Sequence, residues 1–357
     1  MTLDELYLYS IEIIKKYQDK SGGYVACPKY ETYNYCWFRD GSYIAHAMDV
    51  VGEFNSSKLF YEWGCDNILN RSEDIRLGIK NRLESRPVEP HQLIDTRYTL
   101  DGNQGEEFWE NFQLDGIGTW LWALGEHLAI TKRELTGKER VAAELACDYL
   151  LAHWYMPCFD CWEEFSEYVH TYTLASIYAG LYSAQTYLNK DFTILLDKIK
   201  SRIFILSVDS CHFCKYEGTT MVDASLIGLC VPYNIISADN SIMTNTISKI
   251  EEDLLREHGV HRYRKDTFYG GGIWILLTAW LGLYYSKCGN KNRVEEILKW
   301  IKSKANSEGE LPEQLTDHVW DESYIPYWED KWGKSARPLL WSHAKYILLY
   351  SAWKNMQ

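Results

Sequence analysis

Two acidic segments of this sequence combine carboxylates with aromatic side chains or a proline. The first, residues 159–168, places Glu163 directly after Trp162 in the stretch FDCWEEFSEY. The second, residues 310–314, places Glu313 after a proline that favours a defined turn. A carboxyl in apolar surroundings keeps its proton at higher pH than a solvated one. Such a pair suits glycoside hydrolysis, in which one carboxyl protonates the leaving oxygen and the other activates water.

This pairing is not specific by itself, because the chain holds 50 aspartates and glutamates. For Glu163 and its neighbour Glu164, a solvated helix start is an open alternative, since acidic side chains stabilise the first turn of a helix. The chain also holds 15 Trp and 27 Tyr. Aromatic side chains in such numbers fill hydrophobic cores, and they can also form flat surfaces on which sugars stack. The carboxylates therefore need elements that bring them to one place.

Composition excludes several classes of function. A net charge of −13 and a pI near 5.3 leave no basic surface for phosphates, so we expect a small neutral oligosaccharide partner and no nucleic acid. The N-terminal segment lacks the apolar run of a secretory signal, and no stretch approaches the ~20 apolar residues of a membrane helix. We expect a cytoplasmic protein without a membrane partner, and the sequence leaves its oligomeric state open.

Ten cysteines in a chain expected to be cytoplasmic indicate reduced thiols. Two CxxC pairs, Cys158/Cys161 and Cys211/Cys214, raise the alternative of a zinc site. Their separation of roughly 50 residues exceeds the ~15–20 of a compact zinc ribbon. Buried thiols are therefore favoured, and we expect neither a metal nor a cofactor.

Hydrophobic periodicity predicts an all-α protein. Apolar residues recur at helical spacing in these segments: 3–17, 40–52, 55–71, 113–131, 138–154, 169–188, 190–205, 223–236, 241–257, 272–287, 291–305 and 337–354. Six long structure-poor segments separate pairs of these helices: 18–38, 81–112, 155–168, 206–222, 258–271 and 306–336. Six helix pairs with long connections predict an (α/α)6 toroid, in which loops at one rim form the site.

Six segments, in order, resemble glycoside hydrolase family 15, the glucoamylase-like enzymes of the six-hairpin glycosidase superfamily. They are YNYCWFRDGSYIAHAMD at 33–49, TRYTLDGNQGEEFWENFQLDG at 96–116, FDCWEEF at 159–165, VDASLIGL at 222–229, HRYRKDTFYGGGIW at 261–274, and LPEQ at 311–314 followed by RPLLWSHAKYI at 337–347. The resemblance spans most of the chain and keeps the family's order.

The resemblance implies a role for each matching position. Glu163 matches the general acid and Glu313 the catalytic base. The residues implied to bind the sugar or shape its pocket are Trp37, Arg39, Asp40, Trp109, Asp115, Trp162, Glu164 and Arg262. The resemblance also places Asp160 beside the acid, and Trp341, Ser342 and His343 near the base.

Four of these positions have a simpler structural alternative. Arg39 and Asp40 could form an ion pair at a helix start, Asp115 could cap a helix, and His343 could be a core histidine.

The implied activity is that of an exo-acting, inverting α-glucosidase. A site closed around one terminal glucose admits only a chain end, and inversion needs the two carboxyl groups ~6.5–9.5 Å apart, with room for water. Similar proteins act on malto-oligosaccharides, isomalto-oligosaccharides or trehalose. Two alternatives stay open, a non-catalytic sugar-binding or regulatory domain and a trehalase-type hydrolase on the same fold.

The chain departs from the family pattern in three places. Helical periodicity starts near residue 3, so we expect one catalytic domain over residues 1–357, with no N-terminal β-sandwich and no separate carbohydrate-binding module. Cys161 replaces the usual aliphatic residue, and Phe38 is bulkier than is common at its position. Linkage and chain-length preference therefore stay open.

Overall fold

The computed structural model describes residues 1–105, 109–206, 208–209 and 211–356. These residues form two compact units. Unit 1 comprises Met1–Tyr17, Val25–Asn34 and Ser207–Gln357, and unit 2 comprises Gln18–Tyr24 and Tyr35–Leu206.

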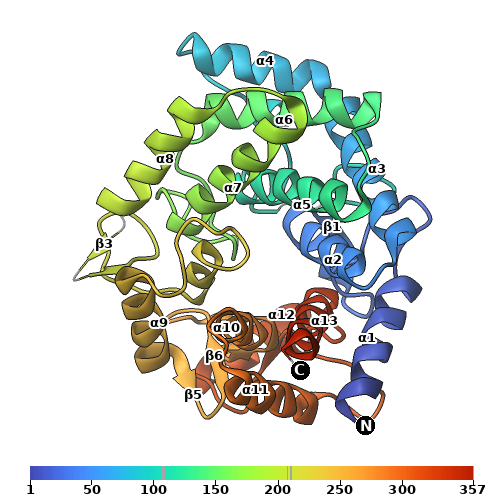
Figure 1. The fold of residues 1–357 in the computed structure, drawn as a ribbon, viewed down its shortest axis with the longest axis vertical. Helices are drawn as coiled ribbons and strands as arrows, with labels where there is room; N and C mark the ends of the chain where they lie inside the picture. Colours follow the sequence, from blue (N-terminus) through green and yellow to red (C-terminus); the bar gives the residue numbers. More distant parts are fainter. Residues whose placement is uncertain (106–108, 207, 210, 357) are drawn as a thin grey trace. The chain divides into compact units, whose positions relative to one another are not determined.

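Unit 2 is built from seven of the helices that the structure describes (Figure 1). They are α2 (Phe38–Val50), α3 (Phe54–Asn70), α4 (Ser72–Leu83), α5 (Asp115–Thr131), α6 (Gly137–His153), α7 (Thr171–Leu188) and α8 (Thr193–Leu206). The unit also holds the 3-10 turn η2 (Pro90–Gln92) and the two-stranded sheet of β1 (Cys36–Trp37) and β2 (Arg97–Tyr98). Helix α5 packs against both α2 and α7, and α6 covers α3 and α4.

Small residues allow α5 and α7 to approach closely. A Cβ added at Gly118 would lie 2.5 Å from the backbone of Ser176, and one at Gly180 would lie 2.4 Å from the carbonyl oxygen of Gly118. Both contacts are shorter than van der Waals distance, so the two helices pack backbone to backbone only because these positions are glycine. This packing fixes the start of α5, where Asp115 lies.

Unit 1 contains the other helices of the described chain. They are α1 (Leu3–Lys16), α9 (Ser241–Leu254), α10 (Ile275–Lys287), α11 (Lys291–Lys304), α12 (Ile325–Trp332) and α13 (Leu340–Asn355). Helix α13 packs on α1, α10 and α11. Buried aliphatic and aromatic side chains of these helices form the core of the unit, including Leu6, Ile275, Ile297, Tyr346 and Leu349.

Short strands and 3-10 turns connect the helices of unit 1. An antiparallel sheet runs in the order β5 (Leu255–Arg256), β6 (Gly259–His261), β7 (Ile273–Trp274) and β8 (Gln314–Leu315). The other short elements are η1 (Glu31–Tyr33), β3 (Val208–Asp209), β4 (His212–Phe213), η3 (Ala224–Leu229), η4 (Phe268–Gly270) and η5 (Glu322–Tyr324). The sheet brings three segments that are distant in sequence next to one another.

The predicted helices agree with the structure except in three places. The segment 223–236 was expected to be one helix, but only the 3-10 turn η3 forms there, because Pro232 lacks an N–H and disfavours a helical residue before it. Helix α4 was missed, since only Ile75 and Gly78 of it are buried and no apolar stripe marks it. Helix α12 was missed because none of its residues is buried.

Candidate active site

Glu163 lies in a tight turn that Asp160 organises. Oδ1 of Asp160 accepts the backbone N–H groups of Trp162 at 2.9 Å and Glu164 at 3.0 Å. The backbone N–H of Glu163 donates to the carbonyl of Asp160 at 3.0 Å. Helix α7 begins only at Thr171, so the alternative of a helix start at Glu163 and Glu164 is wrong.

The backbone of Glu163 is left-handed, with φ of +65°. A non-glycine residue adopts this conformation at a cost of roughly 1–2 kcal/mol and keeps it only where surrounding contacts enforce it. The hydrogen bonds to Asp160 are those contacts, and they aim the Glu163 side chain at a defined position.

The carboxyl group of Glu163 is held from one side by Trp37 and Arg39. The indole N–H of Trp37 donates to Oε1 of Glu163 at 2.6 Å, and Nη2 of Arg39 lies 3.6 Å from the same oxygen. Burial raises the pKa of Glu163 to about 7, and the Arg39 charge and the Trp37 hydrogen bond limit that rise. A carboxyl with this pKa is protonated at mildly acidic pH, as a general acid must be.

Arg39 joins the starts of α2 and α5. Its Nη1 donates to Oε1 of Gln113 at 2.8 Å and lies 3.4 Å from Oδ2 of Asp115, and its Nε lies 3.3 Å from Oδ1 of Asp40. The helix-start ion pair between Arg39 and Asp40 is thus present, yet Arg39 also contacts Glu163. Asp115 is the first residue of α5 and Leu114 is its N-cap, so the capping alternative for Asp115 is wrong.

Burial is the largest influence on the pKa values of Arg39, Asp40 and Asp115. Burial raises the pKa of Asp40 to about 6, although Arg39 lowers it, and burial also raises the pKa of Asp115. Burial opposes the charge on Arg39, but Asp115, Asp40 and Glu163 together hold its pKa above the usual value. Arg39 therefore stays charged, and the carboxylates around it are the groups that titrate.

Aromatic rings line the same part of unit 2. Trp37 and Trp109 meet edge to face, with centroids 5.9 Å apart and an interplanar angle of 77°. Trp162 is buried, and Trp109 is half-buried. Trp109 follows residues 106–108 of the quoted motif at 96–116, which lie outside the described residues.

Arg97 also belongs to this group, and sequence reasoning missed it. It is buried, it pairs with Trp37 in the β1–β2 ladder, and its guanidinium lies 3.8 Å from the centroid of the Trp109 ring. In the sequence, Arg97 stands out only by its place near the start of the 96–116 motif. That place does not reveal that Arg97 pairs with Trp37 on the neighbouring strand.

Glu313 occupies a rigid position in unit 1, where it is 3% exposed. Its backbone N–H donates to the carbonyl of Ala336 at 2.9 Å, and its carbonyl accepts from Ile275 at 3.3 Å. The hydroxyl of Ser342 donates to the carbonyl of Pro312 at 2.8 Å. The segment that carries Glu313 is therefore anchored to the start of α10 and to α13.

His343 is a core histidine, as the plainer alternative held. Its Nε2 accepts the N–H of Leu311 at 3.1 Å, and its Nδ1 lies 2.9 Å from Oγ of Ser10. Burial lowers the pKa of His343 to about 3, so it stays neutral. It supports the segment before Glu313, and Trp341, two residues before it, is also buried.

Arg262 lies in unit 1, directly after β6. Asp266 accepts from it twice, from Nε at 2.7 Å and from Nη2 at 2.6 Å. The carbonyl of Arg262 accepts the N–H of Ala224 at 2.9 Å, and the guanidinium lies 5.0 Å from the centroid of the Trp274 ring. This paired geometry fixes the orientation of a guanidinium that the resemblance assigns to sugar binding.

The predicted site residues thus fall into two groups. Unit 2 holds Trp37, Arg39, Asp40, Trp109, Asp115, Trp162, Glu163 and Glu164, and unit 1 holds Arg262 and Glu313. The separation of the two catalytic carboxyl groups stays a prediction, as does the role of each residue.

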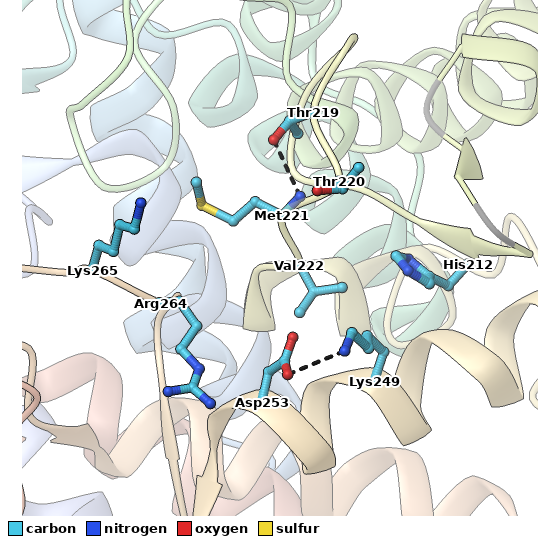
Figure 2. A pocket seen from close by; sticks show the side chains of 9 residues that line it. All are labelled: His212, Thr219, Thr220, Met221, Val222, Lys249, Asp253, Arg264 and Lys265. Carbon is cyan, nitrogen blue, oxygen red and sulfur yellow. Dashed lines mark hydrogen bonds and ion pairs between the residues drawn. The ribbon is translucent and has the colours of Figure 1, made fainter.

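A cavity of about 690 Å³ lies beside the segment that follows Arg262 (Figure 2). Its described lining residues are His212, Thr219, Thr220, Met221, Val222, Lys249, Asp253, Arg264 and Lys265. None of the predicted site residues is among them. Lys249 and Asp253, which face each other across one turn of α9, form an ion pair at 3.2 Å.

Three further findings bear on the expected chemistry. The ten cysteines all lie within the described residues, and none of them forms a disulfide. No group of three or more His, Cys, Asp or Glu in the described chain is placed to hold a metal ion. Each helix in the described part of the chain is too short or too polar to cross a bilayer.

Comparison with known proteins gives the family. The family model of glycosyl hydrolases family 15 matches residues 3–351. The isomaltose glucohydrolase of Kribbella flavida is 36% identical to this chain over 97% of it and 92% of the relative. A solved glycosidase is 34% identical, with a TM-score of 0.95 over 99% of this chain and 97% of that one. A variant of a glycosidase that matches equally well was solved in complex with glucose.

The fold extends to more distant enzymes. A bacterial glucoamylase solved with acarbose has a TM-score of 0.72 and 19% identity, over 99% of this chain and 56% of that one. The likeness confirms the all-α, (α/α)6 fold class that the helical pattern predicted. The match over residues 3–351 confirms the predicted class of enzyme, an inverting glucohydrolase: the chain belongs to glycosyl hydrolases family 15.

Proposed function

We propose that this protein releases glucose, with inversion, from the non-reducing end of short α-glucosides. Glu163 is the general acid and Glu313 the general base. The observation that carries this proposal is the state of Glu163, a half-buried carboxyl with a pKa of about 7 that Trp37 and Arg39 hold in one orientation.

Catalysis requires two proton transfers around one bond. Glu163 gives its proton to the glycosidic oxygen as the bond from that oxygen to the anomeric carbon breaks. Glu313 takes a proton from a water molecule, whose oxygen attacks the anomeric carbon from the opposite face. The products are glucose in the β configuration and the remaining alcohol. Glu163 then regains a proton from solvent, and Glu313 gives its proton to solvent.

The polar groups beside Glu163 suit the end of a sugar chain. Arg39 and Asp40 together offer directional donors and acceptors to neighbouring hydroxyl groups, and Trp37 and Trp109 offer ring faces or edges. A site that pairs buried polar groups with hydroxyls rejects molecules that lack them, because the groups are then left unsatisfied. This supports recognition of one terminal glucose unit.

Isomaltose is the first substrate that we propose. The relative from Kribbella flavida that is 36% identical over almost the whole chain is an isomaltose glucohydrolase, whereas the glucoamylase of Clostridium is 24% identical. We therefore expect α-1,6-linked glucose disaccharides to be cleaved more efficiently than α-1,4-linked ones. The cytoplasmic location and the single-domain organisation stay predictions.

Hydrolysis followed by proton NMR tests the proposal. Isomaltose, maltose and trehalose are each mixed with the protein, and the anomeric signals are recorded within the first minutes. Glucose from the non-reducing end of isomaltose or maltose should appear as the β anomer, so we expect β-glucose to exceed at first the share that it has after mutarotation. We also expect isomaltose to have the highest kcat/KM. An initial excess of α-glucose from isomaltose or maltose would contradict inversion, and a preference for maltose or trehalose would contradict the proposed linkage.

A matched pair of variants shows whether turnover belongs to this site. Glu163→Gln keeps the size of the side chain but cannot give a proton, and Glu167→Gln makes the same change at an exposed position four residues later. We expect the first variant to lose glucose release and the second to keep it. Equal activity in both would remove Glu163 from the mechanism.

A further inference from the structure

Arg97 is a buried cation between two aromatic rings. Its guanidinium carbon lies 3.8 Å from the ring centroid of Tyr35 and 3.8 Å from that of Trp109, and 5.5 Å from that of Trp37. Its exposed fraction is 3%. Cation–π contacts are stronger when the cation is shielded from water, so the three rings and the cation hold one another in place.

The same rings lead directly to Glu163. Trp37 meets Tyr35 at 85° and Trp109 at 77°, and the β1–β2 ladder pairs Trp37 with Arg97. The indole N–H of Trp37 then donates to Oε1 of Glu163 at 2.6 Å. The orientation of that N–H therefore depends on a ring that Arg97 helps to hold.

Arg97 also acts on Glu163 through its charge. Burial is the largest influence on the pKa of Glu163 and raises it. Arg39, the Trp37 hydrogen bond and Arg97 lower that pKa, whereas Asp40 raises it. These are the main influences on the pKa of Glu163, and Arg97 is one of two cations among them.

We propose that Arg97 is a positioning residue for the acid, which keeps the rings of Trp37 and Trp109 in place and sets a positive charge beside Glu163. This inference rests on the proposed function, in which Glu163 gives a proton to the leaving oxygen. Arg97 lies on β2 (Arg97–Tyr98), a segment separate from the 159–165 motif that carries the acid.

Three substitutions separate the charge of Arg97 from its shape. Arg97→Lys keeps the positive charge but lacks the planar guanidinium group. Arg97→Gln keeps a planar polar group without the charge, and Arg97→Met has neither. The pH dependence of kcat/KM on isomaltose is measured for each variant. Arg202→Gln is the matched control, since Arg202 stacks on Tyr155 at 4.4 Å outside the site.

Loss of the cation removes one influence that lowers the pKa of Glu163, so the acid keeps its proton to higher pH. We expect the alkaline limb of the profile to move up by roughly half a pH unit in Arg97→Gln and Arg97→Met. Arg97→Lys and Arg202→Gln should keep the limb of the unaltered protein. Arg97→Lys should still lose roughly tenfold in kcat/KM, because the rings lose their stacking partner.

A second measurement covers variants that turn over too slowly for a profile. The difference in melting temperature between Arg97→Gln and Arg97→Gln/Glu163→Gln, followed against pH, reports the titration of Glu163 without turnover. We expect this difference to continue to grow to higher pH, and to reach a larger value, than the corresponding difference in the unaltered background. An identical pH dependence in both backgrounds would overturn the role of Arg97.

The two proposals fail in different ways. Absence of glucose release by the unaltered protein would overturn the proposed function, and the melting measurement would still test Arg97. Normal turnover with an unmoved alkaline limb in Arg97→Gln would overturn the role of Arg97 alone.

Discussion

Trp37 and Glu163, which are 126 residues apart in the sequence, share a hydrogen bond of 2.6 Å from the indole N–H to Oε1. The bond links the start of α2 to the turn at 160–164. It gives the Glu163 carboxyl a hydrogen-bond donor in a fixed position. Because the Glu163 side chain is only 16% exposed and lies near Arg39, the same surroundings set its protonation and its orientation. Four predictions depend on this arrangement and on the support of Glu313.

The rate of glucose release should fall as the pH rises through about 7. Glu163 must carry a proton to act as an acid, and burial raises its pKa to about 7, so the active fraction declines above that pH. Measurement of kcat/KM from pH 4 to 9 checks this limb. A rate that stays flat across the range would show that Glu163 does not titrate in the reaction.

Glu313→Gln should lower kcat by roughly 10²–10⁴-fold with little change in substrate binding, because a base acts mainly in the transition state. Glu308→Gln, at an exposed position in the same loop, is the control and should keep its activity. Initial rates and binding of a non-hydrolysed glucoside measure the two quantities. Near-normal turnover in Glu313→Gln would remove this residue from the mechanism.

Glu163 should make the fold less stable at neutral pH than at acidic pH. An acid whose pKa is higher in the folded than in the unfolded state contributes stability that is present below pH ~4.5 and lost as the pH rises through about 7. A rise of about 2.5 pKa units corresponds to about 3 kcal/mol as an upper bound.

Glu163→Gln should therefore unfold at higher denaturant concentration than the unaltered protein at pH 8, and at a similar one at pH 4. Chemical denaturation at the two pH values measures the difference. Glu167→Gln, which changes an exposed carboxylate, should show no such pH dependence. A Glu163→Gln variant that is less stable at pH 8 would contradict the linkage.

Asp160→Ala should reduce kcat by roughly ten- to a hundredfold, because the left-handed backbone at Glu163 loses the two hydrogen bonds that enforce it. The free energy of unfolding should fall by about 2 kcal/mol. Asp191→Ala is the matched control, since Oδ1 of Asp191 accepts a similar bond from Thr193 at 2.8 Å in an exposed loop. Equal activity in the two variants would mean that the turn does not depend on Asp160.

Most of the helices could be predicted from the sequence, because their apolar spacing is a local property. Helices α5 and α10 carry apolar residues around most of their circumference and were predicted to within a few residues at each end. Helix α12 packs by the rings of Trp328 and Trp332 against Phe268, and its sequence has no buried stripe to reveal it. Periodicity therefore finds helices that bury a face and misses those that do not.

The sequence by itself determined which side chains are available, namely two carboxylates at positions 163 and 313, with rings and arginines in the family's order. Only the tertiary structure decided the left-handed turn at Glu163 and the place of Arg97 between Tyr35 and Trp109. The physical reason is that strand register and burial arise from contacts between segments far apart in the chain. Those contacts set the pKa of a carboxyl, and no local pattern of residues records them.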